Sequence, residues 1–190
     1  MSETDVEAPE GFAYEPDFLT PDEERELVAT IERLPFAEIH FRGVTARRRV
    51  VHLGWLYDYD THALAAGPPV PAAIEPLRVR AAQLAGLDVE RLEETLVTEY
   101  RPGATIGWHR DAPIFGSRVV GVSLLGRCRM RFRRKRGEAW QTYDQTLEPR
   151  SAYLLSGAAR QSWQHSIPPT RELRYSITFR TVRHAGSRGQ

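Results

Sequence analysis

The chain has 190 residues, a formal net charge of +1 with histidine neutral, and one cysteine, Cys128. A single cysteine excludes an intrachain disulfide and a zinc site built from several cysteines, and it favours a reducing compartment. The nearly balanced charge excludes neither nucleic acid nor a small molecule as a partner, because where charges lie matters more than their sum.

The length suits one domain that buries its own core. We expect this domain to span residues 12–184, between disordered polar tails at residues 1–11 and 185–190. The apolar run from Val119 to Leu125 is too short to cross a bilayer, and the acidic start of the chain lacks the apolar core of a secretion signal. We therefore expect a soluble, cytoplasmic monomer that has no membrane partner.

Two amphipathic helices are expected in the first half of the chain. The first begins after Thr20, a favourable N-cap, with Pro21 at the first helical position and Glu23 placed to complete a capping box. Pro35 ends it. The second covers residues 71–87 and stops near Gly86. Each helix has one apolar stripe, which predicts that it packs against a sheet.

Residues 36–60 combine aromatic and basic side chains without a helical period. They include Arg47, Arg48, Arg49, Trp55 and Tyr57. Burial in the core is one interpretation of the rings. The other is that the rings stack on nucleobases, at roughly 1–3 kcal/mol per base, while the arginines hold phosphates. The arginines at 127–136 leave a similar choice, between phosphate binding and solvated strand faces.

The second half of the chain predicts an antiparallel sheet. Residues 118–125 form a buried strand, and the next segment alternates arginines with Cys128, Met130 and Phe132. One buried and one wet face are typical of antiparallel sheets. Further strands are expected near residues 139–143, 152–155 and 173–182. Short strands around an interior site, with two helices outside, predict an α+β fold with a double-stranded β-helix, or jelly-roll, core.

A metal site is predicted around His109 and Asp111. One residue separates them, so in an extended backbone both side chains leave the same face and can share one ion. His165 is the best candidate for a third ligand. Two histidines and one carboxylate, with other positions open, suit non-haem Fe(II) that must also bind a co-substrate and O2. The same donor set can also hold zinc.

The last expected strand predicts an acidic co-substrate. Its period of two places Arg174, Ser176, Thr178 and Arg180 on one face. If that face points inward, each guanidinium needs a partner, because an uncompensated buried charge is costly. A dicarboxylate supplies one through bidentate, charge-assisted hydrogen bonds. The alternative is a strand whose arginines face solvent.

Over about the last hundred residues the chain resembles a known family. The motifs, in order, are Tyr-x-Pro-Gly from Tyr100, His-x-Asp from His109, Ser-Leu from Ser123, Trp-x-His-Ser from Trp163 and Arg-x-Ser-x-Thr-Phe-Arg from Arg174. Together they are similar to the AlkB family of 2-oxoglutarate- and Fe(II)-dependent dioxygenases. The two arginines of the last motif favour this resemblance over a zinc protein.

The resemblance implies roles for particular residues. Fe(II) would be held by His109, Asp111 and His165, which are therefore also the catalytic residues. The 2-oxoglutarate site would include Thr98, Tyr100, Arg174, Ser176 and Arg180, and O2 would be the second co-substrate. Arg174 would hold the distal carboxylate, and Arg180 the carboxylate beside the keto group. Thr98 stands where many members have asparagine, and its hydroxyl can still donate a hydrogen bond.

The resemblance also implies oxidative demethylation of N-alkylated bases in DNA or RNA, which releases succinate, CO2 and formaldehyde. The base would be single-stranded or flipped out of a duplex. Residues 36–60 resemble the nucleotide-recognition lid of the family. There, Trp55 and Tyr57 would stack on the base, with Trp163 a third candidate, and Arg47 and Arg48 would contact phosphates.

Two alternative functions stay open. The first is the same chemistry on a protein side chain or a small molecule, because residues 112–117 are more similar to family branches outside DNA repair. The second is a binding module that keeps the fold but holds no iron.

Overall fold

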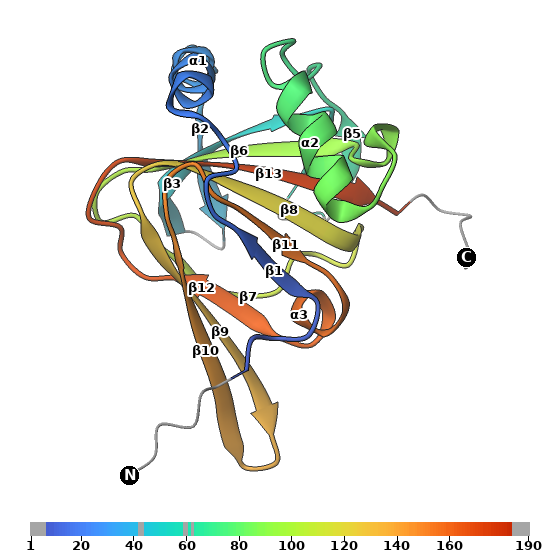
Figure 1. Ribbon diagram of the computed structural model, residues 1–190, viewed down its shortest axis with the longest axis vertical. Coiled ribbons are helices and arrows are strands. Elements are labelled where there is room, and N and C mark those ends of the chain that lie inside the picture. Colours follow the sequence, from blue (N-terminus) through green and yellow to red (C-terminus); the bar gives the residue numbers. More distant parts are fainter. Residues whose placement is uncertain (1–6, 42–43, 59–60, 62, 184–190) are drawn as a thin grey trace.

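The computed structural model describes residues 7–41, 44–58, 61 and 63–183 (Figure 1). The first half contains β1 (Phe12–Glu15), α1 (Pro21–Ile31), β2 (Ala37–Phe41), β3 (Val44–Leu53), β4 (Trp55–Tyr57), β5 (Leu64–Ala66), α2 (Glu75–Ala85) and a 3-10 turn η1 (Val89–Arg91). The second half contains β6 (Glu94–Tyr100), β7 (Ile106–His109), β8 (Phe115–Leu125), β9 (Cys128–Arg136), β10 (Ala139–Leu147), β11 (Ala152–Leu155), α3 (Gly157–Gln161), β12 (Gln164–Ile167) and β13 (Arg174–Val182).

The strands form two main antiparallel sheets. The major sheet has the order β1-β11-β8-β13-β6-β3-β2, and the minor sheet has the order β10-β9-β12-β7. An apolar cluster that includes Val119 and Tyr153 of the major sheet and Phe132 and Ile167 of the minor sheet joins them. This arrangement confirms the expected jelly-roll core. Within the described ranges the two sheets share no ladder, so they do not close into a barrel.

The two expected helices are present. Thr20 caps α1: its side chain accepts a hydrogen bond from the Glu23 backbone, and the Glu23 side chain accepts one from the Thr20 backbone. Helix α2 begins at Glu75, later than predicted, because residues 71–74 form a separate turn closed by a hydrogen bond between Ile74 N and the Pro71 carbonyl. Gly86 ends α2 in the left-handed conformation, with φ of 62°, as expected.

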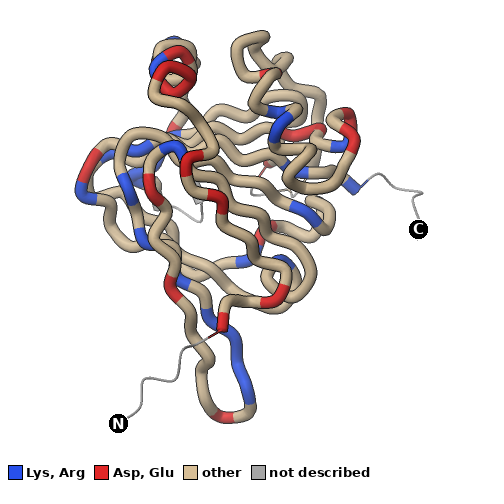
Figure 2. Tube along the Cα trace, viewed as in Figure 1, with Lys and Arg blue, Asp and Glu red and all other residues tan. Residues whose placement is uncertain are grey.

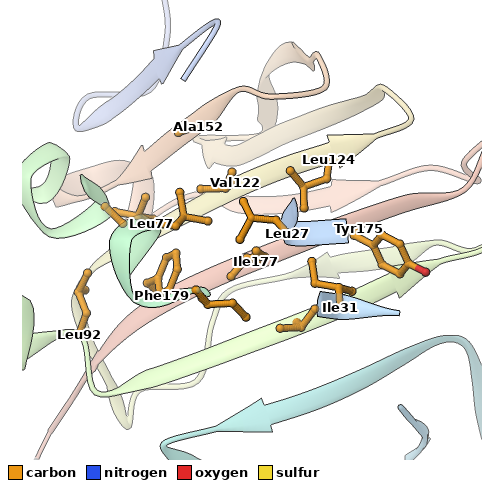
Figure 3. Close-up of a cluster of buried hydrophobic side chains, with 14 of the residues drawn as sticks. Leu27, Ile31, Leu77, Leu92, Val122, Leu124, Ala152, Tyr175, Ile177 and Phe179 are labelled. Carbon is orange, nitrogen blue, oxygen red and sulfur yellow. The ribbon is translucent and has the colours of Figure 1, made fainter. Parts of the chain in front are cut away.

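Both helices cover the outer face of the major sheet. Leu27 from α1 and Leu77 from α2 belong to one buried cluster with Val122, Ile177 and Phe179 of the strands (Figure 3). Complete burial of such a side chain contributes about 1.5–3 kcal/mol, so this layer fixes the sheet against the helices. Because side chains alternate along a strand, the even-numbered residues of β13 must face the opposite side.

That opposite face carries the predicted co-substrate residues. On β13 and its neighbour β6, Arg174 pairs in register with Tyr100, and Ser176 pairs with Thr98. All four residues are buried. The two faces predicted for residues 174–180 are therefore correct, and the alternative of a solvent-facing arginine strand is wrong.

The expected tails lie mostly outside the described residues, which omit 1–6 and 184–190. Residues 7–11 of the tail expected to be disordered are described, and two of them make hydrogen bonds to the rest of the chain. The Glu10 carbonyl accepts a hydrogen bond from Ala159 N, and the Gly11 carbonyl accepts one from Ser156 N, both at 2.8 Å. No helix in the described part of the chain is long and apolar enough to span a membrane.

Candidate metal and co-substrate site

The structure brings the three predicted metal donors together. His109 ends β7, Asp111 follows two residues later, and His165 lies on β12, directly opposite His109 in the strand pairing. One donor atom from each side chain lies within 4.8 Å of the others. His165 could be found in the sequence, but its strand and its partner could not, because β12 has only four residues.

Backbone contacts fix the orientation of this metal cluster. His109 Nδ1 lies 2.9 Å from the Gly107 carbonyl, which favours the tautomer with a proton on Nδ1 and leaves Nε2 available to a metal. Buried Arg160 donates to the carbonyls of Asp111, Ala112 and Phe115 at 3.3, 3.1 and 3.0 Å. Arg160 could not be found from the sequence, since nothing in its own segment connects it with the loop after β7.

The protonation states suit metal binding. Burial and the neighbouring His109 lower the pKa of His165 to about 3. Burial also lowers the pKa of His109, although Asp111 opposes that shift. For Asp111, burial alone would raise the pKa, but Arg180 and the two histidines outweigh it and hold the pKa well below its usual range. Two neutral imidazoles and an ionised carboxylate are the forms that bind a divalent metal.

Arg180 connects the metal cluster to a buried acidic residue. Its Nη2 donates to Asp111 Oδ1 at 2.9 Å, and its Nη1 lies 3.5 Å from Glu94 Oε2. Glu94 has no exposed surface, and its Oε1 lies 3.0 Å from His52 Nδ1. Arg180 was expected beside the keto acid, whereas no sequence pattern pointed to Glu94 or His52.

Arg174 is a buried cation with unused donors. Its Nη2 donates to Ser123 Oγ at 2.8 Å, and its guanidinium carbon lies 5.0 Å from the centre of the Tyr100 ring. Among the described residues, its Nε and Nη1 have no hydrogen-bond partner, although the residue is only 1% exposed. An unfilled buried charge is costly, so a carboxylate ligand is the group that fits this position.

A cavity of about 930 Å³ opens beside the metal cluster. Its lining includes His109, Asp111, His165, Thr98, Tyr100, Ser176, Arg180, Tyr57 and Arg48 together with many apolar side chains. Arg174 is not part of the lining, but Tyr100 and Ser176, which the resemblance assigns to the same co-substrate site, are. Gly121 makes room for one wall: a Cβ there would lie 2.2 Å from the ring of Tyr153, which lines the cavity.

The predicted substrate residues divide into two groups. Buried Tyr57 and half-buried Arg48 line the cavity, and the Tyr57 ring lies 5.2 Å from that of Phe115. Exposed Arg47 and half-buried Trp55 do not line it.

Trp163 also lies away from the cavity lining. It is 1% exposed and belongs to the apolar cluster between the sheets, with Arg134 4.7 Å from its ring. This environment favours a core role. The expected lid at 36–60 is only partly described, because residues 42–43 and 59–60 lie outside the described ranges.

The chain resembles known proteins over most of its length. It matches the family model of the 2OG-Fe(II) oxygenase superfamily over residues 11–180. It is 30% identical over 176 residues to the alkylated DNA repair protein ALKBH8 homolog of Arabidopsis thaliana, covering 80% of this chain and 49% of that protein. It is 28% identical over 188 residues to the uncharacterized protein L905 of Acanthamoeba polyphaga mimivirus, covering 90% and 85%. The chain thus spans about half the length of the Arabidopsis relative.

Solved structures share the fold. OsALKBH1 superposes with a TM-score of 0.68 at 20% identity, covering 91% of this chain and 97% of that one. A prolyl-4-hydroxylase of Pseudomonas putida superposes with a TM-score of 0.63 at 16% identity, covering 91% and 93%. With the family model matched from residue 11 to residue 180, the chain belongs to the 2OG-Fe(II) oxygenase superfamily, whose enzymes use Fe(II), 2-oxoglutarate and O2, and its relatives are AlkB-like.

Proposed function

We propose that this enzyme demethylates N-methylated bases of DNA or RNA by oxidation, in the cytoplasm. The Arabidopsis relative is named as an alkylated DNA repair protein, which supports a nucleic-acid substrate. The observation that carries the proposal is the cavity beside the metal donors. At about 930 Å³ it is near the upper end of the range for small-ligand sites, so it has room for a base besides the five-carbon co-substrate.

The cavity walls suit a flat, largely apolar group. Tyr57 packs beside Phe115 on one wall, and Ile39, Val50 and Ile106 contribute to the lining. A base can enter only when it is unstacked, so a single strand or a flipped nucleotide is the expected form of the substrate. Arg48 also lines the cavity and supplies a positive charge for a flanking phosphate.

The chain's own residues would orient the reactants and exclude water. Fe(II) held by His109, Asp111 and His165 would supply, with 2-oxoglutarate and O2, the power to hydroxylate a methyl group. Arg174 and Arg180 would neutralise the two carboxylates of 2-oxoglutarate. A hydroxymethyl group on a base nitrogen breaks down to formaldehyde and the N–H base, so this last step requires no residue of the protein.

The test is a substrate panel analysed by mass spectrometry. Single-stranded DNA and RNA oligonucleotides carrying 1-methyladenine or 3-methylcytosine are incubated with the reconstituted enzyme, and His109→Ala serves as the inactive control. The proposal predicts loss of one CH2 mass from a methylated strand, only with active enzyme. Succinate formation with every strand unchanged would contradict it and favour the other candidate, a protein side chain or small molecule.

A further inference from the structure

The outer face of the minor sheet carries a cluster of cations and rings. Phe132 of β9 is buried and pairs in register with His165, so this parity of β9 faces the interior. Because side chains alternate, Arg131 and Arg133 must point to the opposite face. Trp108 precedes His109 on β7 and points the same way by the same argument.

The side chains on this outer face contact one another across the strands. The guanidinium carbons of Arg131 and Arg133 lie 5.0 and 4.3 Å from the centre of the Trp108 ring. Arg133 also lies 4.5 Å from the ring of Trp140 on β10, and Lys135 Nζ lies 5.6 Å from the same ring. We call these five residues the basic-aromatic surface. It extends from β7 across β12 and β9 to β10. Strands β9 and β10 form the long hairpin labelled in Figure 1.

Three of the cations on this surface make no ion pair within the described part of the chain. Asp144 stands opposite Arg131 in the strand pairing, but its carboxylate lies within ion-pair distance of Arg129 instead. Arg131 donates to Ser166 Oγ at 3.3 Å and Arg133 to Gln164 Oε1 at 2.9 Å, and both acceptors are neutral. Among the described residues, Arg131, Arg133 and Lys135 have no carboxylate within ion-pair distance. Figure 2 shows a run of basic residues along the β9 arm of the hairpin.

The other end of β9 differs. Arg129 of β9 and Arg127, which comes just before the strand, have the same parity as Arg131, but Arg129 lies 3.4 Å from Asp144 and Arg127 lies 3.9 Å from Glu148. Near Trp108 and Trp140, by contrast, the described cations of β9 on this face make no ion pair. The surface also reaches the strand that carries a metal donor, because Trp108 adjoins His109 on β7 and is itself among the residues that line the cavity. Trp140 is 48% exposed, so much of its ring is available to a ligand.

We propose that the basic-aromatic surface binds the part of a single-stranded nucleic acid that flanks the nucleotide in the cavity. Arginine and lysine side chains would contact phosphates, while Trp140 would stack on a base. An acidic protein segment would satisfy the charges but would make no use of an exposed indole ring. The inference deepens the proposed function, on which it rests for the position of the target base.

The experiment measures strand binding separately from catalysis. The full chain, loaded with Fe(II) and 2-oxoglutarate under nitrogen, is titrated into a fluorescent, unmethylated 15-nucleotide single strand, and anisotropy gives Kd at several salt concentrations. Arg131→Ala/Arg133→Ala should lower the slope of log K against log salt by about 1.4, since each phosphate contact to a single strand contributes about 0.7. Arg127→Ala/Arg129→Ala is the matched control: it removes the same number of cations from the same face at the other end of this segment, and its slope should change by less than half as much.

The role of Trp140 is tested by removing the bases. Trp140→Ala should weaken binding of the normal strand about fivefold or more, whereas Trp140→Phe should keep most of the affinity. On an abasic strand of the same length Trp140→Ala should have no effect. Wild-type affinity and slope in all variants would overturn the proposal. So would equally tight binding of a glutamate 15-mer, which would assign the surface to an acidic protein.

These outcomes are distinguishable from failure of the proposed function. If the unmethylated strand binds with the predicted variant effects but methylated strands yield no formaldehyde, the proposed function fails and the binding surface stands. If formaldehyde forms but the variants bind the strand like wild type, the surface fails and the proposed function stands.

Discussion

Arg180 donates a 2.9 Å hydrogen bond to the carboxylate of Asp111, and it thereby links β13, the last strand in the chain, to the metal cluster. The same guanidinium lies 3.5 Å from Glu94, which is fully buried. One cation thus compensates two carboxylates, and its loss would leave both without their main counter-charge.

Arg180→Met should therefore destabilise the protein strongly. Removing one partner of a buried ion pair costs about 3–5 kcal/mol in the free energy of unfolding, because the remaining charge stays buried. Urea denaturation of the metal-free protein measures this loss. The double variant Arg180→Met/Glu94→Gln should recover part of the lost stability, because only one of the two buried carboxylates then remains without a counter-charge. A single variant as stable as wild type would show that the Arg180 contacts contribute little.

Arg174→Met, unlike Arg180→Met, should affect the binding of 2-oxoglutarate more than the stability of the ligand-free protein. Arg174 makes one hydrogen bond and leaves two donors unfilled among the described residues, so its removal should cost the ligand-free protein little stability. Wild type should gain about 2.7 kcal/mol at 2-oxoglutarate concentrations one hundred times Kd, and the variant should lose most of that gain. Thermal melts with and without 2-oxoglutarate measure both effects. Arg150→Met, which removes a half-buried ion pair with Glu24, should keep the response.

His109→Ala should abolish succinate formation and leave the fold intact, because the side chain lies at the edge of the cavity rather than in a packed cluster. Iron content by elemental analysis should fall well below that of wild type, with unchanged circular dichroism. Chelation of wild type should abolish turnover, and added Fe(II) should restore it in wild type but not in the variant. Turnover that survives in His109→Ala would remove this residue from the ligand set.

The metal-free protein should lose stability as the pH falls. The pKa of His165 is about 3 in the folded state, against 6.5 as its ordinary value. Between these values the unfolded chain binds a proton that the folded chain does not, so this contribution is complete above about pH 6.5 and is lost as the pH falls toward 3. Thermal midpoints from pH 7 to pH 4 should fall less steeply in His165→Gln. Equal slopes would mean that the buried imidazole is not the cause.

Arg48 and Arg47 form a natural matched pair for substrate binding. Arg48 lines the cavity, whereas Arg47 is exposed outside it. A hydrogen bond to a charged group contributes about 1.5–3 kcal/mol, so Arg48→Ala should raise KM for a methylated oligonucleotide roughly tenfold or more. Arg47→Ala should change KM less than threefold, roughly the effect of a weak exposed ion contact. If Arg47→Ala raised KM more than Arg48→Ala did, the phosphates would lie on the other side of β3.

Local patterns predicted the features that depend on one segment. Thr20 and Gly86 mark the ends of helices through backbone capping, and alternation alone identified which of residues 174–180 share a face, although not that this face points inward. The close spacing of His109 and Asp111 indicated a shared ion for the same reason, since both lie within a few residues of one strand end.

Features that depend on strand pairing could not be predicted in this way. Glu94 meets Arg180 only because β6 and β13 pair in a particular register, and no periodicity within either segment reveals it. Ser123 likewise reaches Arg174 from the neighbouring strand β8. Composition also could not show which aromatic residues line the cavity and which belong to the core. Tyr57 lines the cavity while Trp163 fills the core, although both lie in segments rich in polar neighbours.

The most direct test is anaerobic reconstitution with Fe(II) and 2-oxoglutarate, followed, when air is admitted, by parallel measurement of succinate and formaldehyde. With a strand carrying 1-methyladenine or 3-methylcytosine we predict equal amounts of the two products, and with the unmethylated strand only slow succinate formation without formaldehyde. Formaldehyde that fails to exceed the level seen with the unmethylated strand, while succinate still forms, would contradict the proposed nucleic-acid substrate.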